Sequence, residues 1–251
     1  MASVTARISE IKQPNGGYLS IRKFNKIEFQ GGIEELSINE NVHPSLIGMA
    51  VDYLSRYMLT NNVMNAFKIS SFGASNVKEQ DKFLTIIKNI NGLDDISIIS
   101  ALKLCGYDVA YRVGPMYFRS VETINPNKET INNVRIMVNR SLYFFRKYGP
   151  IVSDGFDFEG GYSKIVNKGD GDFLTQDTLW DFKVSKSTPT TQNTLQLLMY
   201  YIMSKKSGKD IFKSINKIGI FNPKLNRVYI YNICAELDDV IRDIEKNVIC
   251  Y

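Results

Sequence analysis

The sequence predicts an α/β fold of the α+β type, in which helices flank a mixed central sheet. Long segments before residue 149 repeat apolar side chains at helical spacing. Residues 151–182 are rich in strand-forming residues interrupted by glycine. A helix, two strands and a final helix follow, and this order is typical of a sheet covered by helices.

The composition is that of a soluble globular protein. The 251 residues can bury one substantial core, and the hydrophobic share of 44% and charged share of 23% are ordinary. No apolar run is long enough to span a membrane, and the first residues lack the apolar core of a signal peptide. We therefore expect a cytoplasmic protein without a membrane partner. The net charge of +5 permits a polyanionic partner.

The first half of the chain is predicted to contain one hairpin and several helices. Residues 3–30 alternate apolar and polar side chains around Pro14-Asn15-Gly16-Gly17, which favours a β-hairpin. A helix should begin at Pro44, a residue suited to a first helical turn. Two further helices should lie within residues 76–105, divided at Asn91-Gly92 and ended by Gly106.

The pattern then changes from helical to extended. Tyr107–Val113 resembles a short strand, and Lys128–Tyr148 forms a long amphipathic helix ended by Gly149-Pro150. The strand signals of residues 151–182 precede a helix over Thr191–Lys205. The remaining elements are strands at Lys217–Phe221 and Arg227–Tyr231, and a helix at about Leu237–Lys246. We expect a single domain, 1–251, with residues of about 61–148 forming a helical insertion or cap.

A hairpin around Gln176-Asp177 is the most informative local prediction. A short turn there pairs Phe173 with Trp180, and these two side chains take one face together with Phe182. In the same register Asp172 lies opposite Asp181 on the other face. Opposed carboxylates repel each other, and a cation between them would relieve the repulsion. Oxygen-rich sites of this kind suit Mg²⁺ or Mn²⁺.

Two more residues belong to the predicted polar face. Asp170 should lie opposite Lys183, either as the ion-pair partner of this lysine or as a further metal ligand. One helical turn apart on the following helix, Gln196 and Tyr200 share a face. Gln192 is a weaker rival for the position of Gln196.

This order and spacing resemble the PD-(D/E)XK nuclease superfamily, and the Gln-x-x-x-Tyr helix is closest to its RecB-like exonuclease branch. The resemblance is good over residues 150–205 and weak elsewhere. It implies a restriction-endonuclease-like core in which Asp172 and Asp181 hold Mg²⁺, assisted by a backbone carbonyl next to Lys183. It also implies that Lys183 and Gln196 act at the metal site and that Tyr200 helps to position nucleic acid.

The resemblance also implies an acidic residue or a histidine on an early helix. Asp52 is our first candidate for this third metal ligand, although it could instead form a surface ion pair with Arg56. His43, at the entry to the same helix, and Glu159 are the alternatives.

Other cofactors are not expected. The three cysteines lie far apart and cannot supply the four-cysteine iron–sulfur cluster of some RecB-like nucleases. The single histidine, His43, rules out mechanisms that need several histidines of one chain. No phosphate-binding GxxxxGK[ST] loop is present, so we expect no nucleotide cofactor.

The resemblance thus implies a Mg²⁺-dependent deoxyribonuclease, with Mn²⁺ as a substitute and DNA rather than RNA as substrate. Exonuclease action is expected only because of the Gln-x-x-x-Tyr helix. Two alternatives stay open: a non-catalytic nucleic-acid-binding protein with the same fold, and a metal-dependent enzyme acting on a small nucleotide or sugar. Strand polarity, oligomeric state and protein partners cannot be inferred.

Overall fold

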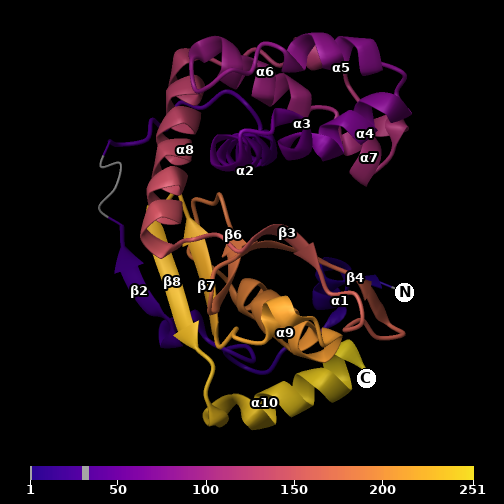
Figure 1. The fold of residues 1–251 in the computed structure, drawn as a ribbon, viewed down its shortest axis with the longest axis vertical. Helices are drawn as coiled ribbons and strands as arrows, with labels where there is room; N and C mark the ends of the chain where they lie inside the picture. Colours follow the sequence, from indigo (N-terminus) through magenta and orange to yellow (C-terminus); the bar gives the residue numbers. More distant parts are fainter. Residues whose placement is uncertain (1, 30–33) are drawn as a thin grey trace. The chain divides into compact units, whose positions relative to one another are not determined.

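A computed structural model describes residues 2–29 and 34–251 (Figure 1). The chain divides into two compact units, residues 1–29 with 144–251, and residues 30–143. The helical block expected at about 61–148 therefore corresponds to a unit that begins earlier and includes the helix starting at Pro44. None of the described helices has the length and apolar character needed to cross a membrane.

A six-stranded sheet organises the first unit, with strand order β2-β8-β7-β6-β5-β3 (Figure 1). β6 and β7 run parallel, and the other neighbours are antiparallel. This confirms the expected mixed sheet with flanking helices. The strands are β2 (Asn25–Glu28), β3 (Ser153–Asp157), β5 (Asp170–Leu174), β6 (Thr178–Phe182), β7 (Lys217–Asn222) and β8 (Arg227–Asn232). A separate two-residue strand, β1 (Ala2–Ser3), pairs with β4 (Val166–Lys168).

The hairpin formed by β5 and β6 has the predicted register at its turn. Phe173 pairs with Trp180, and the Thr175 amide donates to the Thr178 carbonyl at 3.0 Å. The backbone pairing does not continue to Asp172 and Asp181, however. Instead, the Asp172 carboxylate accepts a hydrogen bond from the Phe182 amide at 2.8 Å. The predicted position of Asp172 opposite Asp181 agrees with this register and stays a prediction.

Helices cover the sheet through two apolar layers. Helix α9 (Thr191–Ser207) contributes Leu195 and Leu198 to a core that includes Leu179 and Ile220 of the sheet. On the other face, Phe144 at the end of α8 (Lys128–Tyr148) stacks on Phe221 with ring centroids 4.2 Å apart. Phe173, Trp180 and Phe182 lie on this second face, as predicted: Phe173 contacts Phe145, Trp180 contacts Phe144, and Phe182 contacts both Phe173 and Phe221.

The N-terminal hairpin predicted over residues 3–30 does not form, although the Pro14–Gly17 turn does. Val4–Glu10 is helix α1, and β2 pairs with β8. Ser3 caps the helix by accepting a hydrogen bond from the Ala6 amide, and Val4 and Ile8, four residues apart, are both buried in the α9 core. Tertiary burial of this helical stripe overrides the local alternation. A 3₁₀ turn at Ile21–Lys23 leads into β2.

The secondary structure described in the second unit is helical, and loops join its helices. It contains α2 (Pro44–Thr60), α3 (Val63–Ala66), α4 (Lys68–Asn76), α5 (Gln80–Ile87), α6 (Asp95–Cys105) and α7 (Asp108–Arg112), two 3₁₀ turns at Pro115–Tyr117 and Val121–Thr123, and the start of α8. The predictions of α2, α5, α6 and α8 are confirmed.

The strand predicted at Tyr107–Val113 is wrong, because α7 occupies this segment. Asp108 is buried and accepts hydrogen bonds from the hydroxyls of Tyr53 at 2.5 Å and Ser70 at 2.6 Å. Arg112, one turn later, lies 3.3 Å from the same carboxylate. These contacts favour helical spacing, because they bring residues four apart to one point.

The C-terminal segment returns to the first unit. A 3₁₀ turn at Ala235–Leu237 precedes α10 (Asp238–Asp243), and a π-helical turn over Ile244–Ile249 extends it past the predicted end near Lys246. Another 3₁₀ turn, Asp210–Phe212, follows α9.

Gly219 of β7 provides a test of the packing on the second face. A Cβ atom at this position would lie 2.3 Å from Cζ3 of the Trp180 ring. We expect Gly219→Ala to lower the free energy of unfolding by about 1–3 kcal/mol, because the buried ring must move. Gly92→Ala is the matched control, since nothing lies within 4 Å of its added Cβ. Urea unfolding of both variants measures the difference, and equal midpoints would contradict this account.

Candidate functional site

The predicted polar residues come from three adjacent segments of the first unit. Asp181 is the penultimate residue of β6, and Lys183 follows directly after the strand. Residues two apart in an extended chain share a face, so both side chains point toward α9. Gln196 and Tyr200 lie one turn apart on that helix. The fold therefore brings the Asp-x-Lys segment and the Gln-x-x-x-Tyr helix together.

A continuous chain of polar contacts joins these four side chains. The Lys183 ammonium lies 3.2 Å from Oδ1 of Asp181 and donates to Oε1 of Gln196, also at 3.2 Å. The Gln196 amide nitrogen donates to the Tyr200 hydroxyl oxygen at 2.8 Å. Each side chain is thus held by the next one, and the Lys183 ammonium has a defined position beside the Asp181 carboxylate.

Asp181 is the most deeply buried charged group of this network, with only 2% of its surface exposed. Burial raises the pKa of its carboxyl to about 6; the Lys183 ammonium opposes this rise, and the Asp172 charge adds to it. Within the described part of the chain, Oδ2 of Asp181 is buried without a hydrogen-bond partner. An unpartnered buried oxygen is costly, and it marks the point where a further positive group would be stabilised.

The surroundings of Lys183 and Tyr200 raise the pKa of both side chains. Burial acts to lower the pKa of Lys183, yet the charges of Asp181 and Asp172 outweigh it and raise this pKa above its usual value. Burial also raises the pKa of the Tyr200 hydroxyl, and the neighbouring carboxylates contribute to the rise. At neutral pH we therefore expect a charged lysine beside a neutral tyrosine.

These residues have the donor chemistry that a magnesium ion requires. Mg²⁺ takes oxygen ligands and is often held by only one or two carboxylates, with water and substrate phosphate completing the shell. Asp181 offers its unpartnered Oδ2, and Asp172 lies on the neighbouring strand. Among residues 2–29 and 34–251, no cluster of three or more His, Cys, Asp or Glu side chains is arranged to hold a metal ion. The two aspartates therefore fit a site of the two-carboxylate kind.

Several candidate residues do not join this network. Asp170 is exposed and pairs through its backbone with Asp157 of β3, and its predicted position opposite Lys183 stays a prediction. Glu159 is exposed beyond the end of β3. Gln192 is exposed at the start of α9, which leaves Gln196 as the glutamine of the site.

Asp52 and His43 both belong to the second unit. Asp52 accepts a 2.8 Å hydrogen bond from Nε of Arg56, which is the ion pair weighed as its alternative role. His43 caps α2, with Nδ1 accepting from the Ser45 amide at 3.3 Å. The metal role of either residue, like that of Glu159, stays a prediction.

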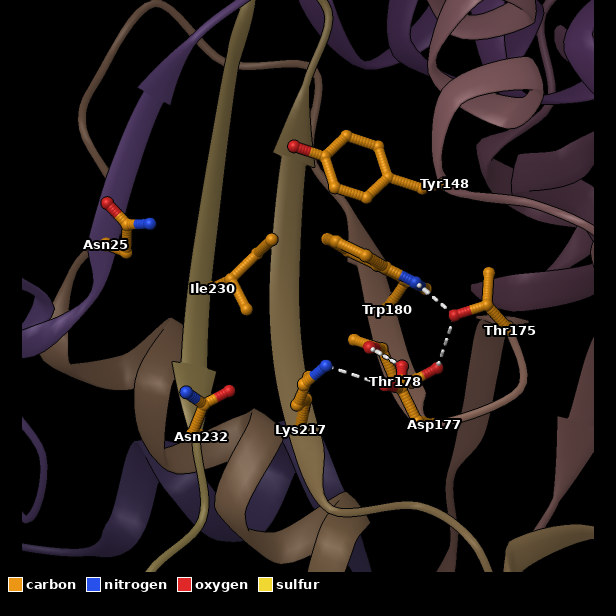
Figure 2. A pocket seen from close by; sticks show the side chains of 9 residues that line it. All are labelled: Asn25, Tyr148, Thr175, Asp177, Thr178, Trp180, Lys217, Ile230 and Asn232. Atoms are coloured by element: carbon orange, nitrogen blue, oxygen red, sulfur yellow. Dashed lines mark hydrogen bonds and ion pairs between the residues drawn. The ribbon is translucent and has the colours of Figure 1, made fainter.

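Nothing in the sequence indicated a second group of polar side chains on the opposite face of the sheet. Asn25, Lys217 and Asn232 come from three different strands and line one pocket with Trp180 (Figure 2). No motif links them, because their proximity results only from the strand order.

Comparisons with known proteins do not identify a family. No protein-family model, curated protein or solved structure matches this chain. The interpretation of the site therefore depends on its residues and their geometry.

The raised pKa of Asp181 predicts a pH effect on the metal-free protein. An unfolded chain has an aspartate pKa of about 3.9, so between that value and the folded pKa of about 6 the folded state binds the additional proton. The resulting stabilisation is complete below the unfolded pKa and is lost as the pH rises through the folded pKa. Asp181→Asn cannot ionise and should gain stability relative to the wild type as the pH rises, by up to about 3 kcal/mol.

Urea unfolding in EDTA at several pH values between 4 and 8 measures this difference. Asp210→Asn is the matched control, because the Asp210 side chain is 87% exposed. A difference between Asp181→Asn and the wild type that does not change with pH would contradict the raised pKa.

The ion pair of Asp52 can be tested separately from any metal role. Asp52→Asn and Arg56→Ala both remove the pair, so each should lower the free energy of unfolding by roughly 0–1 kcal/mol. Thermal melting of the two variants checks this expectation. If Asp52 is only an ion-pair partner, the two variants should also have equal activity; a metal ligand would show a large loss in Asp52→Asn alone.

Proposed function

We propose that this protein is a metal-dependent nuclease that hydrolyses phosphodiester bonds, with DNA as its substrate. The observation that supports this most directly is the contact chain from Asp181 through Lys183 and Gln196 to Tyr200, with one buried carboxylate oxygen left unpartnered. The order Asp172, Asp181, Lys183 and the following helix is also the order in which the PD-(D/E)XK resemblance implies these roles.

The two aspartates would hold Mg²⁺, or Mn²⁺ in its place. A divalent cation bound there supplies a water of lowered pKa and neutralises charge on the phosphoryl oxygens. Asp172 is already positioned by its hydrogen bond from the Phe182 amide. Oδ1 of Asp181 contacts Lys183, and Oδ2 has no hydrogen-bond partner among the described residues.

Lys183 would stabilise charge that develops on the phosphate during cleavage. Its side chain is 31% exposed, so the ammonium can reach a substrate while it contacts Asp181. Gln196 holds this ammonium through its carbonyl oxygen and therefore acts as a positioning residue. Tyr200 is only 5% exposed and orients Gln196 from behind. The predicted contact of Tyr200 with nucleic acid would require its hydroxyl proton to reach a substrate oxygen.

Removal of the Asp181 charge tests the proposal. Asp181→Asn should lower turnover at least a hundredfold, on the order of 3 kcal/mol of transition-state stabilisation, because one charged metal ligand is lost. The assay uses labelled single- and double-stranded DNA, linear and circular, with Mg²⁺, Mn²⁺ or EDTA. Linear substrates degraded while circles persist would indicate exonuclease action.

Asp210→Asn serves as the control and should keep wild-type activity, because Asp210 is an exposed surface residue. Near-normal cleavage by Asp181→Asn would refute the assignment. Binding of DNA by the wild type without cleavage in either metal would instead support the non-catalytic alternative.

Lys183 should affect chemistry more than binding. If its ammonium acts on the transition state, Lys183→Ala retains DNA affinity in Ca²⁺ and loses cleavage in Mg²⁺. Lys213→Ala is the matched control, because Lys213 is 75% exposed. A proportional loss of binding and cleavage in Lys183→Ala would show that this residue only contacts the phosphate of the bound substrate.

A further inference from the structure

A polar pocket lies on the sheet face opposite the Asp181 network. Neighbouring residues of a strand point to opposite faces, so Trp180 faces this pocket while Asp181 faces α9. The pocket has a volume of about 280 Å³, near the lower limit of the roughly 300–1,000 Å³ typical of small-ligand sites. All of its lining residues belong to the first unit.

The pocket lies along one row of side chains across the sheet. Asn25, Ile230, Gly219 and Trp180 are successive partners across β2, β8, β7 and β6. Gly219 contributes no side chain, and the Trp180 ring occupies the space that a Cβ atom would take there. Two residues further along β7, Phe221 stacks on Phe144 of α8 and does not border the pocket.

The walls of the pocket are rigid and apolar on one side. The indole nitrogen of Trp180 donates to Oγ1 of Thr175 at 3.0 Å, which fixes the ring (Figure 2). The Tyr148 ring lies against it, with centroids 5.2 Å apart and planes at 65°. Trp180 is only 2% exposed, so a flat ligand would contact mainly the half-buried Tyr148 ring of this aromatic pair.

The other side is polar and electrically neutral. Lys217 lies 2.6 Å from the Asp177 carboxylate, so its positive charge is balanced within the pocket. The amides of Asn25 and Asn232 and the hydroxyl of Tyr148 border the same space, and Figure 2 marks no hydrogen bond or ion pair from these groups to the other side chains drawn. They provide both donors and acceptors. Such a site favours a neutral ring with polar edges and gives no advantage to a phosphate.

We propose that this pocket binds a nucleobase, with its edge on the Asn25 and Asn232 amides and its ring beside Trp180 and Tyr148. Side-chain amides can form paired hydrogen bonds with a base edge, and aromatic rings stack on bases. The choice of a base over another polar ring rests on the proposed nuclease function. The base can come from a free nucleoside or from a nucleic-acid strand.

Trp180 is the single tryptophan of the chain, so intrinsic fluorescence reports directly on this pocket. The wild-type protein is titrated with adenosine, guanosine, cytidine and thymidine, with their 5′-monophosphates, and with glucose. We expect saturable quenching by at least one nucleoside, and no gain in affinity from the phosphate. Absence of saturation by every nucleoside up to millimolar concentration, or saturation by glucose alone, would overturn the proposal.

A double variant tests the recognition of the base edge. Asn25 and Asn232 are both exposed, so Asn25→Ala with Asn232→Ala should fold normally. We expect its nucleoside affinity to fall by at least about tenfold, because two amide contacts are lost. Asn65→Ala, an exposed asparagine of the second unit, is the control and should bind as the wild type does. Unchanged affinity in the double variant would refute the base contacts.

The source of the base is distinguished with a short single-stranded oligonucleotide, bound by Asp181→Asn with and without the two asparagine substitutions. Weaker binding of the oligonucleotide in the combined variant shows that the pocket receives a base of a strand; nucleoside binding without this effect shows a free nucleoside. Cleavage assays on the asparagine double variant keep the two proposals separate. Nucleoside binding without any DNA cleavage would refute only the nuclease function, and cleavage without nucleoside binding would refute only the pocket.

Discussion

The burial of Asp181 within the sheet is the constraint on which the site depends. A carboxylate that is 2% exposed needs a positive partner, and Lys183 provides one at 3.2 Å. Lys183 in turn needs an oxygen on its other side, which Gln196 supplies from α9. The position of α9 against the sheet, through the apolar core around Leu195 and Leu198, is therefore also what holds the polar network together.

Among the described residues, this network leaves one buried oxygen, Oδ2 of Asp181, without a hydrogen-bond partner. A polar cluster selected only for stability would satisfy every buried atom, because an unpartnered oxygen costs about 1–3 kcal/mol. Here Oδ2 of Asp181 has no hydrogen-bond partner within the described residues, and burial keeps the pKa of this carboxyl raised. The chain thus tolerates a local cost at this carboxylate, and perturbed pKa values of this kind are common at functional sites.

Strand β6 contributes to two different environments through alternate residues. Asp181 enters the polar network below α9, while Trp180 and Phe182 face the aromatic layer formed with the end of α8. The absence of a side chain at Gly219 gives the Trp180 ring its space, and the neutral pocket lies beside this ring. A charged site and an aromatic pocket can therefore lie on opposite faces of the same short strand, separated only by the thickness of the sheet.

The sequence by itself determined the elements whose patterns are local. The α8 helix, the Phe173–Trp180 register and the shared face of Asp181 and Lys183 follow from helical spacing, turn chemistry and strand alternation. The place of Gln196 beside these two residues was implied by the family resemblance. Tertiary structure decided the elements in which the local sequence pattern predicts one conformation and the tertiary contacts stabilise another. Residues 4–10 became a helix because Val4 and Ile8 find a core on α9, and Asp108 keeps α7 helical through Tyr53 and Ser70.

The same distinction applies to the two sites. The register of the β5–β6 hairpin was anticipated, but the side-chain contact of Asp172 with the Phe182 amide was not. The pocket could not be anticipated at all, because Asn25, Lys217 and Asn232 become neighbours only through the order of β2, β8, β7 and β6. Sequence periodicity shows which face a residue occupies, whereas strand order, set by the lowest free energy of the whole chain, shows which residues share that face.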